Sequence, residues 1–493
     1  MSTTISAKMS ELLKDPSLVK TGSLINGDWH SSDATFDVLN PYDQEVLVSV
    51  SEVAKDDMSQ VEKAIASAKR AQQEWQQKTA YERYDLMMAW FDLMIQHKED
   101  LAIIMTLEQG KPLKESRGEI EYGASYVKWF AEESKRIYGD TIPALASNQT
   151  IKVIKEPVGV VAAITPWNFP NSMLARKIAP AIAAGNSIVA RPTELTPLSA
   201  LVLGELANRA GIPKGVINIL VGSNAKEVGK VLTTHEDVDK FSFTGSTNVG
   251  KLLMEQCAST VKKVSFELGG NAPFIVFEDA DIDAAVDGAI KAKFRNAGQT
   301  CVCVNRIMVH SSVHDEFVEK FVEKVKLLDV GNGLDNVDIG PLIHPKAADD
   351  VRELVREATE QGATIKYGQL LSGTIQSPIV ITDVNNEMQI AKTEIFGPVA
   401  AIQRFETEKQ AVLLANDTPF GLASYFYSQN ASRIERVSRG LKYGIVGVNE
   451  GLISNAAAPF GGVKQSGFGR EGSLYGLDDY LNMKYICTTY EMS

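Results

Sequence analysis

The sequence predicts an α/β protein built from two doubly wound domains. Its 493 residues are too many for a single hydrophobic core, so two or three domains are expected. From Pro157 onward, short apolar runs alternate with helical patterns of about 10 to 15 residues. Apolar strands separated by helices in this way are typical of a parallel sheet with right-handed crossover connections.

Two helical patterns, at 57–73 and 81–108, come before the first sheet and are expected to cover it. The first α/β series has strands at 158–164, 187–190, 216–221, 240–243 and 262–266, and helices at 198–210 and from Val249. The second series has strands at 273–277 and near Ile307, Ile365 and Val399, and helices at 281–295, 313–327 and 346–361. A site is expected in the crevice between the two series.

Charge and composition exclude several classes of partner. The net charge is −12 and no block of lysine or arginine occurs, which argues against nucleic acid and anionic membranes. No apolar run approaches the roughly 20 residues of a membrane-spanning helix, and the N-terminus lacks the apolar core of a secretory signal. We therefore expect a cytoplasmic protein that acts on a small molecule.

Four cysteines, Cys257, Cys301, Cys303 and Cys487, are too few for a disulfide framework in a chain of this length. The close pair Cys301 and Cys303 lacks companion ligands at zinc-like spacing, so no metal is expected. A reducing compartment is the simpler interpretation.

Cys301 and Glu267 are the residues most suggestive of chemistry. Cys301 ends the run Gly298-Gln-Thr-Cys301, and Glu267 lies in Phe266-Glu267-Leu-Gly-Gly270. A thiol and a carboxylate suit a covalent thioester mechanism, in which the thiolate attacks a carbonyl carbon and the carboxylate later activates water. Taken alone, a cysteine is at least as often an inert packing residue.

Two glycine motifs resemble nucleotide-binding sequences, and only the first lies where a phosphate could bind. Gly245-Ser-Thr-Asn-Val-Gly250-Lys251 follows a strand and precedes a helix, where backbone N–H groups can meet a phosphate. A P-loop NTPase, the alternative from another class, is opposed by Leu252 because that motif needs serine or threonine there. The run Gly467–Gly472 matches the dinucleotide fingerprint but has no room for the required β-α-β unit.

Several motifs together resemble the NAD(P)-dependent aldehyde dehydrogenase superfamily. They are Thr165-Pro-Trp167-Asn168-Phe-Pro170, Phe243-Thr-Gly245-Ser246, Phe266-Glu267-Leu-Gly-Gly270, Gly298-Gln-Thr-Cys301, Glu394-Ile-Phe396-Gly-Pro398 and Pro459-Phe-Gly-Gly-Val-Lys-Gln-Ser-Gly467. The resemblance implies a cofactor-binding domain at 1–126 and 149–260, a catalytic domain at 261–443 and a return segment at 444–474 that lines the active site. It also implies a small β arm at 127–148 and 475–493 that joins subunits into a homodimer or homotetramer.

The resemblance assigns catalytic roles that agree with the chemistry of the residues. Cys301 attacks the aldehyde to give a thiohemiacetal, whose oxyanion is held by the Asn168 side-chain amide and the Cys301 backbone N–H. Hydride passes to the nicotinamide and leaves a thioester, and Glu267 activates the water that hydrolyses it. Read without the family, Asn168 is equally well a turn residue and Glu267 a surface carboxylate.

The resemblance also outlines the cofactor site. It places Gly245 and Ser246 at the diphosphate, Glu394 on the nicotinamide ribose and Phe396 beside the nicotinamide. Glu194 faces the adenosine ribose, where a carboxylate repels a 2′-phosphate and so favours NAD over NADP. Arg191 stands where the family usually has lysine and keeps NADP as an alternative. The remaining predicted cofactor contacts are Thr165, Trp167, Gly250 and Leu268.

Arg176, Arg295 and Ser454, together with the Cys301-Val-Cys303 pattern, resemble the succinate-semialdehyde dehydrogenases, in which two arginines and a serine bind the distal carboxylate of the substrate. Charged forked donors suit a desolvated carboxylate. Either arginine alone is more often part of a surface salt bridge. The alternatives are glutarate semialdehyde, another ω-oxo acid or a broader range of aliphatic aldehydes. The resemblance also suggests Cys303 as a reversible redox partner of Cys301.

Overall fold

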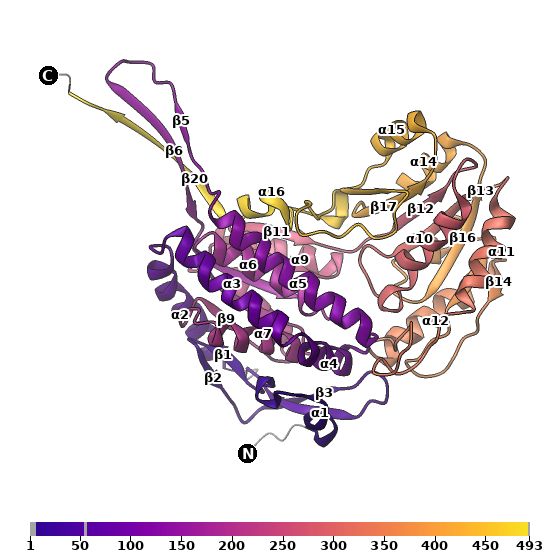
Figure 1. The fold of residues 1–493 in the computed structure, drawn as a ribbon, viewed down its shortest axis with the longest axis horizontal. Helices are drawn as coiled ribbons and strands as arrows, with labels where there is room; N and C mark the ends of the chain where they lie inside the picture. The colour runs from indigo at the N-terminus through magenta and orange to yellow at the C-terminus, as the bar shows by residue number, and fades with distance from the viewer. Residues whose placement is uncertain (1–5, 54–56, 492–493) are drawn as a thin grey trace.

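Two large sheets flanked by helices make up the body of the computed structural model, which describes residues 6–53 and 57–491 (Figure 1). The first sheet contains, in spatial order, β19 (Gly467–Phe468), β11 (Lys263–Glu267), β10 (Lys240–Thr244), β7 (Val160–Thr165), β8 (Ser187–Pro192), β9 (Ile217–Ile219), β1 (Ser23–Ile25) and β2 (Asp28–His30). The strands from β11 to β9 are parallel, as predicted. The antiparallel edge strands β19, β1 and β2 are additions that the apolar pattern does not predict.

The order of the parallel strands reverses between β7 and β10. From β7 the chain moves outward through β8 and β9, and it then returns to place β10 on the other side of β7. In doubly wound sheets a ligand crevice opens at the carboxyl ends of the strands where this reversal occurs. The loops that follow Thr165 and Thr244 therefore begin at the crevice.

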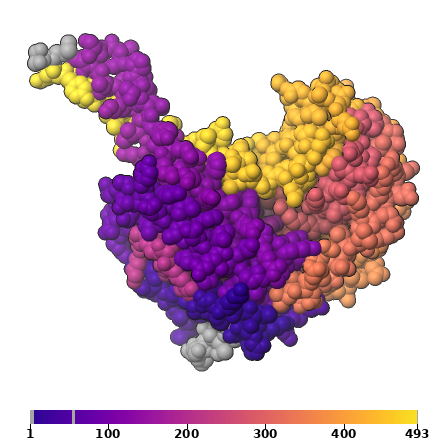
Figure 2. All heavy atoms as spheres, viewed as in Figure 1, coloured from indigo at the N-terminus to yellow at the C-terminus, as the bar shows by residue number. Residues whose placement is uncertain are grey.

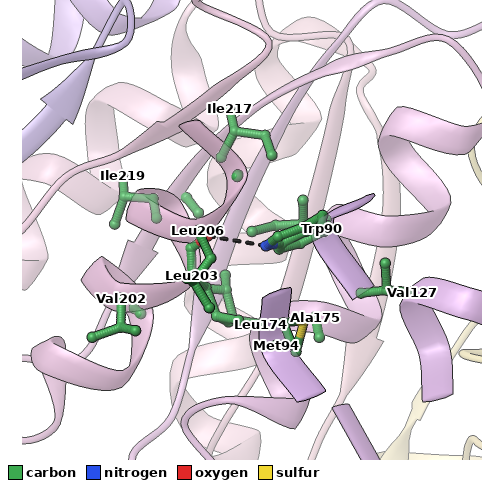
Figure 3. Close-up of a cluster of buried hydrophobic side chains, with 14 of the residues drawn as sticks. Trp90, Met94, Val127, Leu174, Ala175, Val202, Leu203, Leu206, Ile217 and Ile219 are labelled. Carbon is green, nitrogen blue, oxygen red and sulfur yellow. Dashed lines mark hydrogen bonds between the residues drawn. The ribbon is translucent and has the colours of Figure 1, made fainter. Parts of the chain in front are cut away.

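Side chains of the central strands point alternately into two apolar layers. Val161 and Ala163 join one layer, and Ala162 and Ile164 join the other. The helices of the first layer are α3 (Ala80–Gln96), α4 (Lys98–Gln109), α5 (Leu113–Ser134), α6 (Ser172–Ala183) and α7 (Pro197–Arg209), and those of the second are α2 (Ser59–Trp75), α8 (Ala225–Thr234) and α9 (Thr247–Cys257). Figure 3 shows part of the first layer around Trp90, whose Nε1 donates to a backbone carbonyl of α7 at 3.1 Å. Helices on both faces explain why most side chains of these central strands are apolar and buried.

The prediction of one helix at 81–108 is wrong, because the chain breaks at His97 into α3 and α4. His97 has φ −96° and ψ 14°. Just after the break, the buried carboxylate of Asp100 accepts hydrogen bonds from the backbone N–H groups of Lys14 (2.8 Å) and Asp15 (3.0 Å). A contact with so distant a segment leaves no trace in the local apolar pattern.

The second large sheet contains, in spatial order, β14 (Thr364–Tyr367), β15 (Ile379–Thr382), β16 (Val399–Phe405), β13 (Val304–His310), β12 (Ala272–Val276), β17 (Ala423–Tyr427) and β18 (Ile445–Val448). All neighbouring pairs are parallel except β14 with β15. The helices of this part are α10 (Ile282–Phe294), α11 (His314–Val325), α12 (Pro345–Glu360), α13 (Gln389–Lys392), α14 (Glu408–Asn416) and α15 (Ala431–Gly440). The predicted second α/β unit is therefore present.

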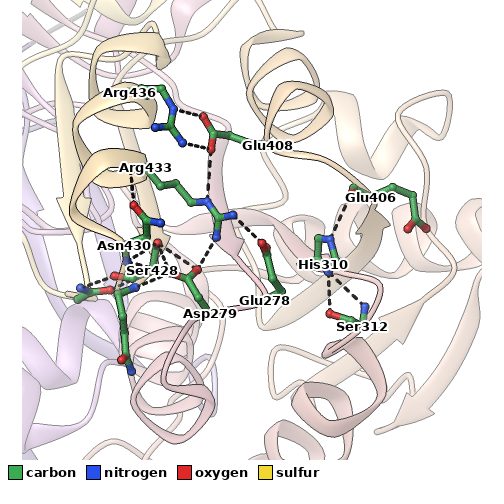
Figure 4. A network of polar contacts seen from close by, with 12 residues as sticks. Glu278, Asp279, His310, Ser312, Glu406, Glu408, Ser428, Asn430, Arg433 and Arg436 are labelled. Atoms are coloured by element: carbon green, nitrogen blue, oxygen red, sulfur yellow. Dashed lines mark hydrogen bonds and ion pairs between the residues drawn. The ribbon is translucent and has the colours of Figure 1, made fainter.

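An ion-pair network ties α14 and α15 to the loop after β12 (Figure 4). Arg433 of α15 pairs with Glu278 (2.5 Å), Asp279 (2.5 Å) and Glu408 (3.3 Å). Glu408 also pairs with Arg436 at 2.8 Å. These residues line neither of the cavities described below, so we assign the network a structural role.

A three-stranded antiparallel sheet projects from the body as an arm (Figures 1 and 2). Its order is β20 (Leu481–Thr489), β6 (Gln149–Pro157) and β5 (Asp140–Ile142). The predicted limits of the arm, 127–148 and 475–493, differ from these strands: 127–134 belong to α5, and β6 belongs to the arm. Residues 492–493 lie outside the described part of the chain.

The segment 444–474 connects the two large sheets, since it contributes β18 to the second and β19 to the first. The other elements of the described chain are α1 (Ala7–Leu12), the paired strands β3 (Thr35–Leu39) and β4 (Val46–Ser51), α16 (Ser473–Asp478) and the short 3-10 helices η1 (Pro16–Leu18), η2 (Ala258–Thr260), η3 (Arg295–Gly298) and η4 (Lys464–Ser466). The division into domains at 126, 149, 260 and 443 stays a prediction, and its residues 1–5 and 54–56 lie outside the described ranges. Within those ranges, no helix combines the length and apolar character needed to cross a bilayer.

Candidate active site

Asn168 lies in the loop between β7 and α6, at the crevice of the first sheet. The N-cap residue of α6, Asn171, makes no capping hydrogen bond with its own side chain. Instead, the buried carboxylate of Glu119 in α5 accepts hydrogen bonds from the N–H groups of Asn171 (3.0 Å) and Ser172 (3.1 Å). Lys111 donates to Glu119 (2.6 Å) and to the carbonyl oxygen of Asn168 (2.7 Å). A buried ion pair therefore fixes the loop that carries Asn168.

We expect the substitution Lys111→Met to destabilise the protein strongly. It leaves the carboxylate of Glu119, whose side chain is 1% exposed, without its charged partner. Removing one member of a buried pair typically costs about 3–5 kcal/mol of unfolding free energy. Thermal melting should show a clear fall in melting temperature for Lys111→Met and a smaller fall for the double variant Lys111→Met/Glu119→Gln.

The matched control is Lys346→Met, which breaks the exposed pair of Lys346 with Asp350. Its melting temperature should stay close to that of the parent protein. Equal melting temperatures for Lys111→Met and Lys346→Met would show that the buried pair does not hold the loop.

The loop before Cys301 adopts a left-handed backbone. Asn296, Ala297 and Gly298 have φ values of 52°, 54° and 77°. A side chain at Gly298 would come within 2.2 Å of the carbonyl oxygen of Gly397, so only glycine fits there. This unusual backbone turns the chain from α10 back towards the crevice.

Asn296 links this loop to the Asn168 loop. Its backbone N–H donates to Glu115 (2.8 Å), and its side-chain Nδ2 donates to the carbonyl oxygen of Asn168 (2.9 Å). The Asn168 Nδ2 in turn donates to the carbonyl oxygen of Gln299 at 3.1 Å. Since Nδ2 carries two hydrogens, one donor of Asn168 remains for a ligand.

A first cavity of about 280 Å³ brings together many of the predicted residues. Those that line it are Trp167, Asn168, Arg176, Gly245, Ser246, Glu267, Leu268, Cys301, Glu394 and Phe396. Glu267 ends β11 of the first sheet, whereas Cys301 precedes β13 of the second. The thiol and the carboxylate thus meet at one cavity from the two α/β units.

A second cavity of about 290 Å³ shares Arg176 and Cys301 with the first and adds Arg295 and Ser454. Its volume is near the lower end of small-molecule sites, which suits a short substrate. All predicted substrate-binding residues therefore lie at one cavity that also contains the candidate nucleophile.

The surroundings of Glu267 raise the pKa of its carboxyl group. Burial, followed by the neighbouring charge of Glu471, raises the pKa of Glu267 well above its usual range. For Glu471, burial alone would raise the pKa, but the charges of Arg176 and Lys177 outweigh burial and lower the pKa to about 2. Glu471 thus stays ionised, and the raised pKa makes the ionised form of Glu267 a stronger general base than an ordinary carboxylate.

Burial also raises the pKa of the Cys301 thiol to about 12. The thiol is therefore neutral at physiological pH and must lose a proton before it can act as a nucleophile.

The two predicted substrate arginines differ in availability. Arg176 is 2% exposed, and its Nε and Nη2 contact Glu471 at 2.7 and 2.5 Å. Arg295 is half-buried, with its Cζ 5.3 Å from the ring centroid of Phe169. Within 6–53 and 57–491, no carboxylate lies at ion-pair distance from Arg295. Arg295 therefore forms no ion pair, although the nearby carboxyl of Glu115 interacts with its charge, whereas Arg176 is paired directly with Glu471.

Most of the predicted nucleotide residues lie at the ends of β7, β8 and β10, whereas Leu268 follows β11 and Glu394 and Phe396 precede β16. Ser246 caps α9 by accepting a hydrogen bond from the N–H of Val249, so the helix begins at the cavity. The hydroxyl of Thr244, which lines the cavity, is buried without a hydrogen-bond partner in the described chain. Trp167 and Phe396 pack edge to face with centroids 5.5 Å apart. A helix N-terminus, an unsatisfied hydroxyl and an aromatic pair fit a dinucleotide.

Four predicted cofactor residues line neither cavity: Thr165, Arg191, Glu194 and Gly250. Arg191 Nη2 donates to Glu194 (2.8 Å) and to the carbonyl oxygen of Gly222 (2.8 Å). A side chain at Gly250 would lie 2.5 Å from Leu268, so this glycine permits close packing of α9. The Arg191 and Glu194 pair thus forms a separate polar group beyond the first cavity.

Cys303 lies against Lys293 rather than in a cavity. Lys293 Nζ is 3.3 Å from the Cys303 Sγ, which also contacts the carbonyl oxygen of Lys293 at 3.4 Å. Cys303 lines neither cavity, although Cys301 lines both. The redox pairing of the two thiols stays a prediction.

Sequence reasoning missed the functional residues that act through distant contacts. Lys111 and Glu119 hold the Asn168 loop, and Glu471 lies in the glycine run 467–472, whose first two residues form β19 and pair with β11. A charged residue inside an otherwise apolar helical pattern could have marked Lys177, which pairs with Glu471 at 2.7 Å. No local signal identifies the partner of each charge.

The chain is similar to known proteins in sequence and in fold. The family model described as "Aldehyde dehydrogenase family" matches residues 29–486. The chain is 53% identical to the 3-sulfolactaldehyde dehydrogenase of Pseudomonas putida (96% of this chain, 98% of the relative) and 52% identical to the NADP(+) succinate-semialdehyde dehydrogenase of Escherichia coli K12 (96% and 99%). It is also 52% identical to the glutarate-semialdehyde dehydrogenase of Pseudomonas putida (96% and 99%). A solved structure of succinate-semialdehyde dehydrogenase from Burkholderia pseudomallei superposes with a TM-score of 0.95 at 51% identity, covering 97% of this chain and all of that one.

Proposed function

Because the chain belongs to the aldehyde dehydrogenase family, we propose that it oxidises succinate semialdehyde to succinate with NAD as the favoured cofactor. The observation that carries the substrate assignment is the guanidinium of Arg295, which has no carboxylate partner in the described chain and lines the same cavity as Cys301. A desolvated carboxylate requires a charged, forked donor of this kind. Ser454 adds a hydroxyl at the same cavity.

Catalysis begins when the Cys301 sulfur, having lost its proton, attacks the aldehyde carbon. The oxyanion that forms accepts hydrogen bonds from the free donor of Asn168 Nδ2 and from the Cys301 backbone N–H. Losing one such donor typically costs about 3–4 kcal/mol of transition-state stabilisation. A nicotinamide bound at the first cavity supplies the hydride acceptor.

The second half of the reaction is hydrolysis of the thioester on Cys301. Glu267 takes a proton from a water molecule while the water oxygen attacks the thioester carbon. The carbon–sulfur bond then breaks, succinate leaves, and the sulfur regains a proton. The raised pKa of Glu267 makes its ionised form a stronger base for this role.

The cofactor assignment is NAD(P) for the family and NAD as our proposal for this chain. Arg191 is already engaged by Glu194 and by the carbonyl oxygen of Gly222. An arginine so engaged offers less to a 2′-phosphate, and the carboxylate of Glu194 repels one. The relative from Escherichia coli is named for NADP(+), so the activity assay compares NAD with NADP.

The test compares succinate semialdehyde with butanal, in which a methyl group replaces the carboxylate. The unmodified enzyme should use succinate semialdehyde with much higher kcat/KM, and with NAD better than with NADP, measured by absorbance of the reduced nicotinamide. Arg295→Met should lower kcat/KM for the semialdehyde by about 2 kcal/mol or more, roughly 30-fold, because a buried carboxylate loses its charged partner.

Butanal is the internal control, since its kcat/KM should change little in Arg295→Met. Equal use of both aldehydes by the unmodified enzyme would contradict the substrate assignment. A higher kcat/KM with NADP than with NAD would contradict the cofactor preference alone.

Glutarate semialdehyde is the second candidate, because one relative with 52% identity carries that name. One extra methylene changes binding in an apolar pocket by only about 1–3 kcal/mol, so the same assay should include it. The rival P-loop NTPase hypothesis is not supported, since the chain belongs to a dehydrogenase family.

We further propose that the arm joins subunits into a homodimer or homotetramer. Its strand β20 exposes Met483 (78%) and Tyr485 (63%), and exposed apolar side chains on an edge strand favour pairing with another chain. The cytoplasm remains our expected location, on the sequence arguments given above.

A further inference from the structure

Tyr122 and Tyr126 lie one turn apart on α5, beside the second cavity. Their hydroxyl oxygens are 2.9 Å apart, and their rings meet edge to face with centroids 5.1 Å apart. Tyr126 is fully buried, whereas Tyr122 is half-buried and lines the cavity together with Arg176, Arg295 and Ser454.

The surroundings of the pair decide which hydroxyl donates. Among the residues described, Tyr126 has no other hydrogen-bond partner than Tyr122, and a buried hydroxyl proton needs an acceptor. Burial also raises the pKa of Tyr126 well above its usual range, so its proton stays in place. The Tyr122 oxygen therefore accepts from Tyr126, which leaves the Tyr122 proton free to point into the cavity.

The cavity needs such a donor because Arg176 is partly engaged. Its Nε is 2.7 Å from Glu471, and its Cζ lies 5.6 Å from the ring centroid of Tyr126. Arg295 forms no ion pair and can bind an anionic ligand at this cavity, but a carboxylate has about four lone-pair sites, more than one forked guanidinium fills. A hydroxyl with a free proton at the same cavity as Arg295 can supply a further hydrogen bond.

We propose that Tyr122 is a specificity-determining residue that donates a hydrogen bond to the distal carboxylate of the substrate, together with Arg295 and Ser454. This inference rests on the proposed function, because it requires an anionic substrate. A hydroxyl donor stabilises a carboxylate but gives nothing to the methyl end of a neutral aldehyde. Tyr126 acts only through Tyr122, as the residue that fixes the direction of its proton.

The experiment uses the full-length enzyme and the variants Tyr122→Phe, Tyr126→Phe and Tyr122→Phe/Tyr126→Phe. Tyr122→Phe should raise KM for succinate semialdehyde about tenfold or more with little change in kcat, and should leave KM for butanal unchanged. Tyr126→Phe should change KM for the semialdehyde by less than about twofold, because Tyr122 keeps its free proton. Calorimetry with succinate and enzyme without nucleotide should show the same order of affinities.

The double variant guards against misfolding, since it removes both hydroxyls and leaves no buried hydroxyl unpaired. It should match Tyr122→Phe in KM and the parent in melting temperature. Equal KM values for Tyr122→Phe and the parent, in an enzyme that prefers the semialdehyde, would overturn the role of Tyr122 alone. An equal rise in Tyr126→Phe would also overturn it, because the pair would then act as a structural unit. A parent enzyme that shows no preference for the semialdehyde would instead overturn the proposed function.

Discussion

Replacing Cys301 by serine should abolish aldehyde oxidation, with kcat/KM lower by at least ~10⁴-fold, as for the loss of other covalent nucleophiles. A serine hydroxyl loses its proton far less readily than a thiol, and no thioester can form on it. Nucleotide binding should persist, because the residues that line the rest of the first cavity are unchanged. The measurement is the steady-state rate with succinate semialdehyde, together with nucleotide affinity by fluorescence.

Cys303→Ser is the matched control for this prediction. It replaces a thiol two residues away that lines neither cavity and contacts Lys293 instead. Its rate should stay within a few-fold of the parent rate. A Cys301→Ser enzyme with near-parent activity, or a Cys303→Ser enzyme as inactive as Cys301→Ser, would refute the assignment of the nucleophile.

Replacing Glu267 by glutamine should stop the reaction after one turnover. Loss of a general base typically lowers the rate of the step it catalyses by about 10²- to 10⁴-fold, and here that step is hydrolysis of the thioester. Rapid mixing should show a burst of reduced nicotinamide equal to the enzyme concentration, followed by a slow steady state. Mass spectrometry of the stalled enzyme should find an acyl group on Cys301.

The pH profile gives a second measure of the same residue. Glu267 must be ionised to take a proton, and burial followed by the charge of Glu471 raises its pKa well above the usual range. The hydrolysis rate of the parent enzyme should therefore fall as pH is lowered through that raised value, well before ordinary carboxylates titrate. Glu267→Gln should lose this dependence. A burst-free Glu267→Gln enzyme with the parent pH profile would exclude Glu267 as the base.

The sequence by itself predicted the parallel strands, the second α/β unit and the family. Each of these depends on information that is local in the chain. The apolar runs of β7, β8 and β10 specify buried strands, because helices cover both faces of the sheet. Cys301 and Glu267 can be identified from the sequence because each lies in a short glycine-containing motif whose residues are neighbours in the chain.

The tertiary structure alone decided how the charges are shared. Arg176 and Glu471 lie 295 positions apart, and Lys111 and Asn168 lie 57 apart, so no periodic pattern links them. The break at His97 and the pairing of the Tyr122 and Tyr126 hydroxyls likewise depend on which groups become neighbours after folding. The physical reason is that a side chain carries its charge and hydrogen-bonding capacity in the sequence, but burial and the choice of partner determine what it can still offer to a ligand. For that reason, residue type predicted two equivalent substrate arginines, and only packing distinguished the engaged Arg176 from the available Arg295.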